Sequence, residues 1–165
     1  MRMDYSDWYA RVSTPFRGEK SRRVLALVDN ALVYAFAVVY GGMLVYLAFT
    51  SDARLLKTFL VPAATFALVT VVRAALNKPR PYEAFPIEAL IRKDTQGKSM
   101  PSRHMSSAVV IAATAFWLWP AIGVVLFVLC CVIAFTRIVG GVHFPRDIVV
   151  ATVIALACAV LGILL

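Results

Sequence analysis

Five long apolar runs occupy most of this 165-residue chain and constrain its fold more than any other feature. A helix needs about 20 consecutive apolar residues to cross the hydrocarbon core of a bilayer. The runs cover residues 24–49, 55–76, 105–119, 121–139 and 147–165. The third run is short and needs the residues before it as its first turn. The sequence therefore predicts an all-α, polytopic membrane helix bundle with five transmembrane helices, formed by one domain over residues 1–165.

The composition supports a bilayer as the surroundings of this bundle. Hydrophobic residues make up 61% of the chain, and the mean hydropathy of +0.80 is too high for a soluble domain. The net charge of +8 does not indicate nucleic acid, because the basic residues cluster beside the apolar runs. Anionic lipid head groups or phosphate are the expected partners, while the sequence sets no oligomeric state.

Residues 1–23 differ from the rest of the chain. They mix charges with the aromatic residues Tyr5, Trp8, Tyr9 and Phe16, which is typical of a segment lying at the membrane interface. No cleavable signal peptide is expected, because this stretch carries acidic residues and lacks an apolar core. We predict an interfacial N-terminal segment at 1–23 and the transmembrane bundle at 24–165.

Five spans place the N-terminal segment, the 77–101 loop and the 140–146 link on one face of the membrane. Of the 17 Lys and Arg residues, all but Arg54 and Lys57 belong to this face, which leaves 17 minus 2, or 15. The positive-inside rule then puts this face in the cytoplasm, provided that residues kept there for chemistry do not inflate the count.

Two polar clusters flank the second and third runs, and the loop between them, 77–104, is the candidate active-site loop. Arg73 and Arg80 bracket the end of the second run, an arrangement that interfacial anchoring alone would also explain. Pro79 and Pro81 are expected to break the helix after Asn77. Ser102 is placed to N-cap the third run, whose free backbone N–H groups suit an anion. His104 lies in the same first turn, where an incidental histidine is the alternative.

A third cluster joins the fourth and fifth runs. His143 and Asp147 are four residues apart, so they can meet at the start of a helix. A carboxylate bonded to one imidazole nitrogen fixes the tautomer and makes the other nitrogen a better nucleophile or base. Asp147 can also serve simply as a helix-start acid. Arg137 ends the fourth run, and a charge there calls for an anionic partner.

All three clusters fall on one face by a topology derived without reference to them. The only two histidines of the chain are both among these residues. Guanidinium groups, a helix N-terminus and two imidazoles together suit a tetrahedral dianion and the exchange of protons around it. No set of Asp, Glu and His with metal-ligand spacing is present in the sequence, so we expect no metal and no cofactor.

At these residues the sequence resembles the type-2 phosphatidic acid phosphatase superfamily, which includes lipid phosphate phosphatases and undecaprenyl pyrophosphate phosphatases. The family pattern is K-x6-R-P, then P-S-G-H, then S-R-x5-H-x3-D. Here the three motifs read Arg73 to Arg80-Pro81, Pro101-Ser102-Arg103-His104, and Thr136-Arg137 to His143 and Asp147. They occur in the family order and at the family spacing, and the resemblance covers roughly residues 55–165.

The resemblance implies a phosphohistidine mechanism. His143 would attack phosphorus, Asp147 would orient and polarise it, and His104 would protonate the leaving lipid oxygen. Phosphate oxygens would be held by side chains from all three motifs. Those side chains are Arg73, Arg80, Ser102 and Arg137.

Three positions depart from the family pattern. Arg73 replaces a lysine, which keeps the charge but changes the donor geometry, and Thr136 replaces a serine. Arg103 replaces a glycine and adds a guanidinium that can contact a second phosphate or a head group. We therefore include Arg103 among the candidate phosphate-binding residues.

Two indications disagree about the side of the membrane on which the active face lies. Without Arg73, Arg80, Arg103 and Arg137, the count becomes 15 minus 4, or 11, against 2, which still favours the cytoplasm. Most bacterial relatives are thought to work on the outer face, and family members usually have six spans.

The expected function is hydrolysis of a phosphate monoester or diphosphate on a lipid in a bacterial plasma membrane. Candidate substrates are a polyprenyl phosphate or diphosphate, phosphatidic acid and phosphatidylglycerol phosphate. Two alternatives share the same residues: a phosphotransferase that passes the phosphoryl group to a lipid or sugar, and a catalytically silent lipid-binding protein.

Overall fold

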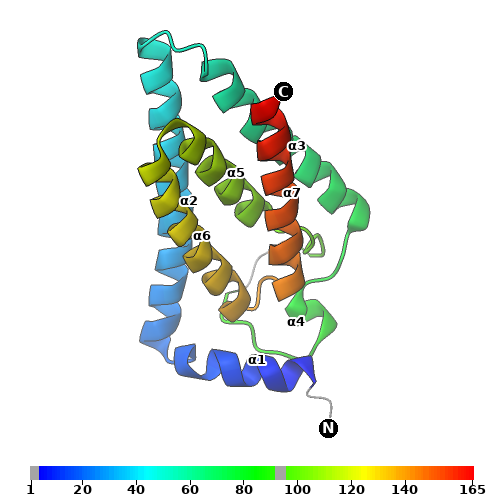
Figure 1. The fold of residues 1–165 in the computed structure, drawn as a ribbon. Coiled ribbons are helices and arrows are strands. Elements are labelled where there is room, and N and C mark those ends of the chain that lie inside the picture. Colours follow the sequence, from blue (N-terminus) through cyan, green and yellow to red (C-terminus); the bar gives the residue numbers. More distant parts are fainter. Residues whose placement is uncertain (1–3, 92–95) are drawn as a thin grey trace.

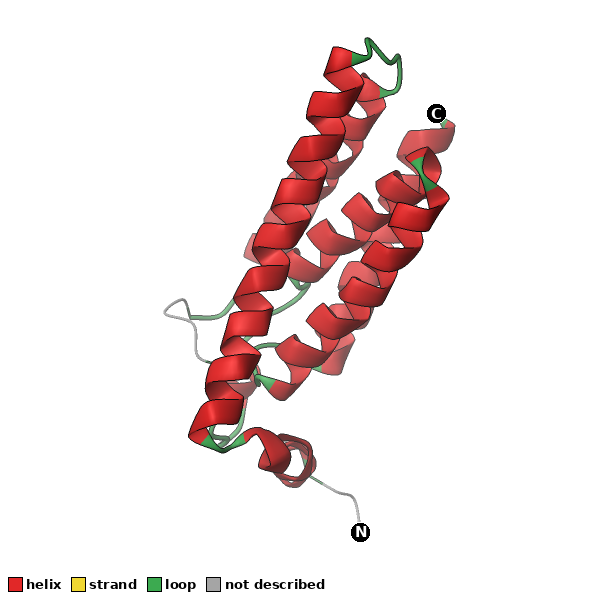
Figure 2. Cartoon of the chain, turned by 90° about the vertical axis from the view of Figure 1, so that its left-hand side faces the viewer, coloured by secondary structure: helices red, strands yellow, loops and turns green. Residues whose placement is uncertain are grey.

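The computed structural model describes residues 4–91 and 96–165 and confirms an all-α fold, with no strand in these two ranges (Figures 1 and 2). Residues 92–95, which belong to the predicted active-site loop, lie outside the described residues. The helices are α1 (Tyr5–Ser13), a short 3-10 helix η1 (Thr14–Phe16), α2 (Glu19–Phe49), α3 (Leu55–Leu76), α4 (Pro81–Ala84), α5 (Arg103–Leu118), α6 (Pro120–Val139) and α7 (Pro145–Leu164).

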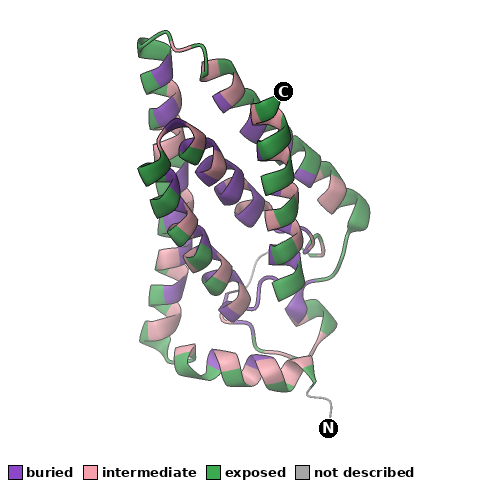
Figure 3. Ribbon diagram, viewed as in Figure 1, coloured by how far each residue is buried: buried purple, intermediate pink, exposed green. Residues whose placement is uncertain are grey.

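Within the described ranges, four helices are long and apolar enough to cross a membrane: α2, α3, α6 and α7. The predicted count of five is therefore one too high. Helix α5 has 16 residues, and at about 1.5 Å per residue it is roughly 24 Å long, shorter than the ~30 Å hydrocarbon core. It packs against all four long helices and is largely buried among them (Figure 3). Helix α5 is thus the central helix of the bundle.

The outward faces of the long helices carry exposed apolar side chains, which would contact lipid in a bilayer (Figure 3). Val38 of α2 and Val71 of α3 are among them. A soluble monomer rarely exposes so much contiguous apolar surface. The first long helix begins at Glu19, five residues before the predicted run, because its charged first turns continue the helix beyond the apolar stretch.

Helix α1 lies across the end of the bundle, beneath the 77–91 and 140–144 segments (Figure 1). Tyr9 is buried, and its hydroxyl donates to the carbonyl of Val139 at 3.0 Å and accepts from the amide of Leu90 at 3.3 Å. Gly141 has a φ of +74°, and a Cβ there would come within 2.7 Å of the Tyr9 hydroxyl. The position therefore requires glycine.

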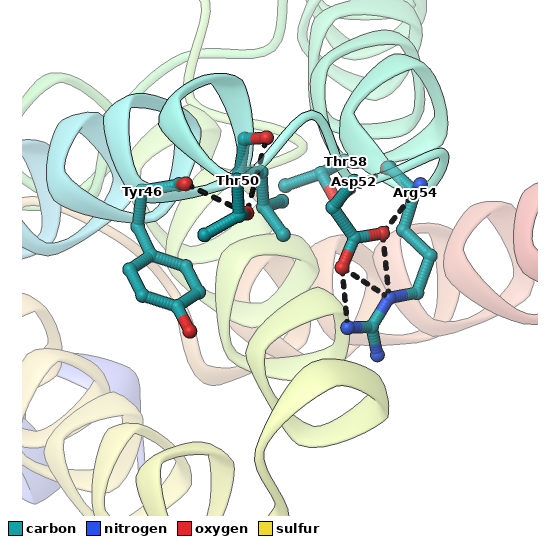
Figure 4. Close-up of polar contacts among 6 residues, drawn as sticks. Tyr46, Thr50, Asp52, Arg54 and Thr58 are labelled. Atoms are coloured by element: carbon teal, nitrogen blue, oxygen red, sulfur yellow. Dashed lines mark hydrogen bonds and ion pairs between the residues drawn. The ribbon is translucent and has the colours of Figure 1, made fainter.

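The turn between α2 and α3 closes the opposite end of the bundle (Figure 4). Thr50 caps α2 by donating to the carbonyl of Tyr46 at 2.9 Å. The Asp52 carboxylate accepts from the backbone amide of Arg54 at 2.8 Å and from its guanidinium at 2.6 Å. These contacts with Arg54 lower the pKa of Asp52 to about 2. The turn lies far from the three polar clusters (Figure 1).

Candidate active site

The first cluster is held by the end of α3 and the loop that follows. Arg73 lies in the last turn of α3, which Asn77 ends in a left-handed conformation with φ of +38°. Arg80 precedes α4, is buried, and donates from Nη1 to the carbonyl of Val142 at 3.4 Å. This contact joins the first cluster to the third. The predicted break after Asn77 is confirmed, because the helix ends there.

The second cluster opens α5. Ser102 occupies the N-cap position as predicted, but its side chain makes no capping hydrogen bond, so the expected side-chain cap is wrong. Its amide instead donates to the carbonyl of Asp147 at 3.2 Å, which brings it to the third cluster. The Ser102 hydroxyl is buried and makes no hydrogen bond within the described residues. It is therefore available to a substrate oxygen.

In the third cluster, His143 and Asp147 meet as their spacing predicts. His143 Nδ1 lies 3.6 Å from Asp147 Oδ2, and each side chain is 1% exposed. Asp147 lies in the first turn of α7, where its Oδ2 also accepts from the amide of Phe144 at 3.1 Å. With Nδ1 facing the carboxylate, a neutral imidazole carries its proton on Nδ1 and keeps the lone pair on Nε2.

Burial lowers the pKa of His143 to about 4, and the positive charges of Arg80 and Arg73 act in the same direction, against the raising effect of Asp147. Desolvation disfavours the imidazolium, and nearby cations add to that penalty. At neutral pH the imidazole is therefore uncharged and carries a lone pair on Nε2.

Arg137 at the end of α6 is also fully buried, and its anionic partner within the protein is Asp29 of α2. Arg137 Nε lies 2.9 Å from Asp29 Oδ1, and both side chains are 2% exposed. Thr136, the residue in the family serine position, donates from Oγ1 to the same carboxylate oxygen at 3.1 Å. An anionic partner for Arg137 was expected from the sequence, but Asp29 could not be identified as that partner, because its only signal was a charge inside an apolar run.

Two guanidinium groups, those of Arg73 and Arg80, act electrostatically on His143. Arg73 also interacts with Asp147 and with three other arginines. Those arginines are Arg80, Arg103 and Arg137. Four guanidiniums within electrostatic reach of one another, two of them beside an imidazole, form a site suited to a phosphate dianion.

His104 and Arg103 lie at the polar end of an otherwise apolar cleft between α2, α3, α5 and α6. The cleft has a volume of about 320 Å³. The Arg103 guanidinium lies over the ring of Phe66, 5.3 Å from its centroid. The cleft thus places an apolar surface next to a cation and an imidazole.

One residue of this site was missed by the sequence analysis. Ser99 is fully buried, and its hydroxyl donates to Asp147 Oδ2 at 2.6 Å. Its Oγ also lies 3.5 Å from His143 Nδ1. A serine in a polar loop carries no periodic or motif signal, so only the folded loop shows this role.

Residues 54–165 match the PAP2 superfamily. The structure is similar to the crystal structure of LpxE from Aquifex aeolicus, with a TM-score of 0.72, 22% sequence identity, and coverage of 99% of this chain and 100% of that one. It is also similar to a transmembrane PAP2-type phosphatidylglycerolphosphate phosphatase from Bacillus subtilis, with a TM-score of 0.71, 18% identity, and coverage of 94% and 81%. No curated protein matches the sequence.

The fold and the site define a class of protein, the multi-pass membrane phosphatases that act on lipid phosphates. The chain belongs to the PAP2 superfamily, since the match covers more than half of its length. The resemblance seen in the three sequence motifs is confirmed. The roles of the individual residues stay predictions.

Proposed function

We propose that this protein hydrolyses a phosphate monoester or diphosphate on a lipid through a phosphohistidine intermediate at His143, without a metal ion. The observation that carries this proposal is a buried, neutral imidazole beside Asp147 in a group of four guanidiniums. An imidazole must be unprotonated to attack phosphorus, because only then does Nε2 carry a lone pair, and the cations offset the repulsion between the phosphate dianion and that lone pair.

In the first step, His143 Nε2 attacks phosphorus, the phosphorus–nitrogen bond forms, and the bond from phosphorus to the lipid oxygen breaks. His104 gives its proton to that oxygen, so the lipid leaves as an alcohol or as a monophosphate. Asp147 stabilises the charge that develops on the imidazole ring. Arg73, Arg80 and Arg137 hold the equatorial oxygens.

In the second step, water attacks the phosphohistidine. The neutral His104 takes a proton from that water, the phosphorus–nitrogen bond breaks, and inorganic phosphate leaves. His143 recovers its Nε2 lone pair and Asp147 stays ionised. The Ser102 hydroxyl, which makes no hydrogen bond within the described residues, supplies a further contact to a phosphate oxygen.

The apolar cleft supports a lipid as the substrate. Its walls are mainly apolar residues of α2 and α5, and His104 stands at its polar end. A lipid tail in this cleft would place its head group next to the proposed acid. Candidate substrates are a polyprenyl phosphate or diphosphate, phosphatidic acid and phosphatidylglycerol phosphate, and the structural relatives favour a bacterial plasma membrane.

Arg103 adds to the charge available for the head group. It lies within electrostatic reach of Arg73 and is held over Phe66. A guanidinium stacked on a ring keeps its edge donors for another anion. We assign to Arg103 a second phosphate or another anionic group of the substrate.

The test measures phosphate release from these lipids by protein purified in detergent, in a buffer that contains a metal chelator. Wild type is compared with His143→Ala, and Arg54→Ala at the opposite end of the bundle is the matched control. We expect release by wild type and the control and none by His143→Ala. No release from any lipid, or equal release by the mutant, would refute the mechanism, and labelled phosphate found on an acceptor would identify a phosphotransferase.

A further inference from the structure

Ser99 has a closer contact with the Asp147 carboxylate than His143 has. The Ser99 hydroxyl donates to Asp147 Oδ2 at 2.6 Å, whereas His143 Nδ1 lies 3.6 Å from the same oxygen. The first distance is typical of a strong hydrogen bond from a hydroxyl to a charged oxygen, and the second is beyond ordinary hydrogen-bond length. The same carboxylate oxygen therefore faces both side chains, but the serine hydroxyl makes the closer contact with it.

The loop that carries Ser99 is fixed at several points. The Ser99 amide donates to the carbonyl of Lys78 at 2.8 Å. The Glu83 carboxylate accepts from the amide of Gly97 at 2.9 Å and from the amide of Arg80 at 2.8 Å. Gly97 has a φ of +62°, and a Cβ there would lie 2.6 Å from Asn77 Oδ1. These contacts tie Ser99 to the loop that supplies the phosphate-binding Arg80.

We propose that Ser99 is a positioning residue of the His143–Asp147 pair: it anchors the carboxylate and takes up part of its charge, which adds to the effect of burial in disfavouring protonation of the imidazole. A carboxylate with a strong donor has less charge to offer to another group. When phosphorylation makes the His143 ring cationic, the anchored Asp147 is already placed to stabilise it. This inference rests on the proposed function of His143.

Other charged and titratable groups act on this pair from the elements packed around it. They are Tyr5 of α1, Arg73 of α3, Arg80 before α4 and Arg146 of α7. Arg103 of α5 and Arg137 of α6 lie within electrostatic reach of Arg73. Replacing Ser99 leaves all of them in place. If replacing Ser99 changes the pKa of His143, the change is therefore due to the loss of the Ser99 hydroxyl.

The experiment compares wild type with Ser99→Ala and Ser99→Thr, and uses Ser106→Ala as the matched control. Ser106 is equally buried, and its hydroxyl donates to a carbonyl of its own helix, that of Arg103, at 3.0 Å. For each variant, kcat/KM for phosphate release is measured against pH, together with the midpoint of thermal unfolding. The ionisation of the substrate is common to all variants and cancels in the comparison.

We expect Ser99→Ala to lower kcat at least about tenfold, the loss typical of a hydrogen bond to a charged group. The acidic limb of its kcat/KM profile should move to higher pH by about one unit, because Asp147 then gives its full charge to the imidazolium. A folded Ser99→Thr should restore both values, and Ser106→Ala should change neither. The proposal is overturned if the acidic limb of Ser99→Ala stays at the wild-type pH. It is also overturned if Ser99→Thr folds but has the same kcat and acidic limb as Ser99→Ala.

A second measurement does not depend on activity. The chain has two histidines, so a His104→Gln background leaves one imidazole for titration by NMR. Adding Ser99→Ala should raise the pKa of His143, and an unchanged pKa contradicts the inference. The two proposals fail separately. Activity retained in His143→Ala refutes the phosphohistidine intermediate. If His143→Ala is inactive but Ser99→Ala leaves the pKa of His143 unchanged, only the role of Ser99 is refuted.

Discussion

The buried ion pair between Asp29 and Arg137 gives the sharpest prediction about stability. Arg137 Nε lies 2.9 Å from Asp29 Oδ1, and both side chains are 2% exposed. Asp29→Ala removes the anion and leaves Arg137 buried with a further cation, Arg80, within electrostatic reach. Thr136 keeps its second acceptor, the carbonyl of Ile133 at 3.0 Å, so the main loss is electrostatic.

Removing one partner of such a pair costs about 3 to 5 kcal/mol, because the remaining charge stays desolvated. In a chain of 165 residues, each kcal/mol lowers the midpoint of thermal unfolding by about 2 to 4 °C. Asp29→Ala should therefore unfold about 6 to 20 °C below wild type. Inorganic phosphate should recover part of this loss, because it can pair with the stranded guanidinium.

The assay is thermal unfolding in detergent, arranged as a double-mutant cycle. Asp29→Ala combined with Arg137→Ala removes both charges and should be more stable than Asp29→Ala alone, because no uncompensated charge stays buried. Asp52→Ala is the control, because it breaks a more exposed pair with Arg54 and should leave the midpoint nearly unchanged. If Asp29→Ala unfolds within about 2 °C of wild type, and the double mutant is no more stable, the pair does not hold α2 to α6.

Four further predictions concern the site and the core. Because burial lowers the pKa of His143 to about 4, the acidic limb of the kcat/KM profile that belongs to His143 should lie near pH 4. Stability should fall by roughly 3 kcal/mol as the pH drops from 6.5 to 4, since only the unfolded chain takes up the proton there. Arg103→Ala should lower turnover of lipid diphosphates more than of monophosphates, and an equal loss on both excludes a second phosphate contact. Gly123→Ala should lower the unfolding midpoint strongly, because a Cβ would lie 2.3 Å from Phe116 Cα, whereas Gly42→Ala has nothing within 4 Å and should not.

The sequence predicted the parts of the site that depend on local spacing. The separation of His143 and Asp147 by four residues placed them on one turn, and the structure confirms their approach. The helix break after Asn77 also followed from local chemistry, since the prolines that come next cannot continue a helix. Such features need no knowledge of how distant segments pack.

The errors lie where tertiary packing decides. A hydropathy count cannot show that α5 is surrounded by four other helices, so a short apolar helix was counted as a span. Ser99 reaches Asp147 from a loop that Glu83 holds at Gly97 and that the carbonyl of Lys78 holds at Ser99. Asp29 of α2 pairs with Arg137 of α6, and these two helices are distant in sequence. Each of these contacts joins residues whose separation carries no periodic signal.

Asp29 and Ser99, the two residues that the sequence did not predict, both affect the charge of the site. Four guanidiniums interact within the site, and the adjacent carboxylates are Asp29 and Asp147, which leaves 4 minus 2, or a charge of +2, while His143 is neutral. Arg146, 3.9 Å from Asp147, and the proton that the proposed mechanism requires on His104 add to this positive excess, which suits a phosphate dianion. The family glycine in place of Arg103 would lower the excess by one unit. In the proposed role, Ser99 acts in the same direction as burial, because a protonated His143 would add a cation where the dianion must approach.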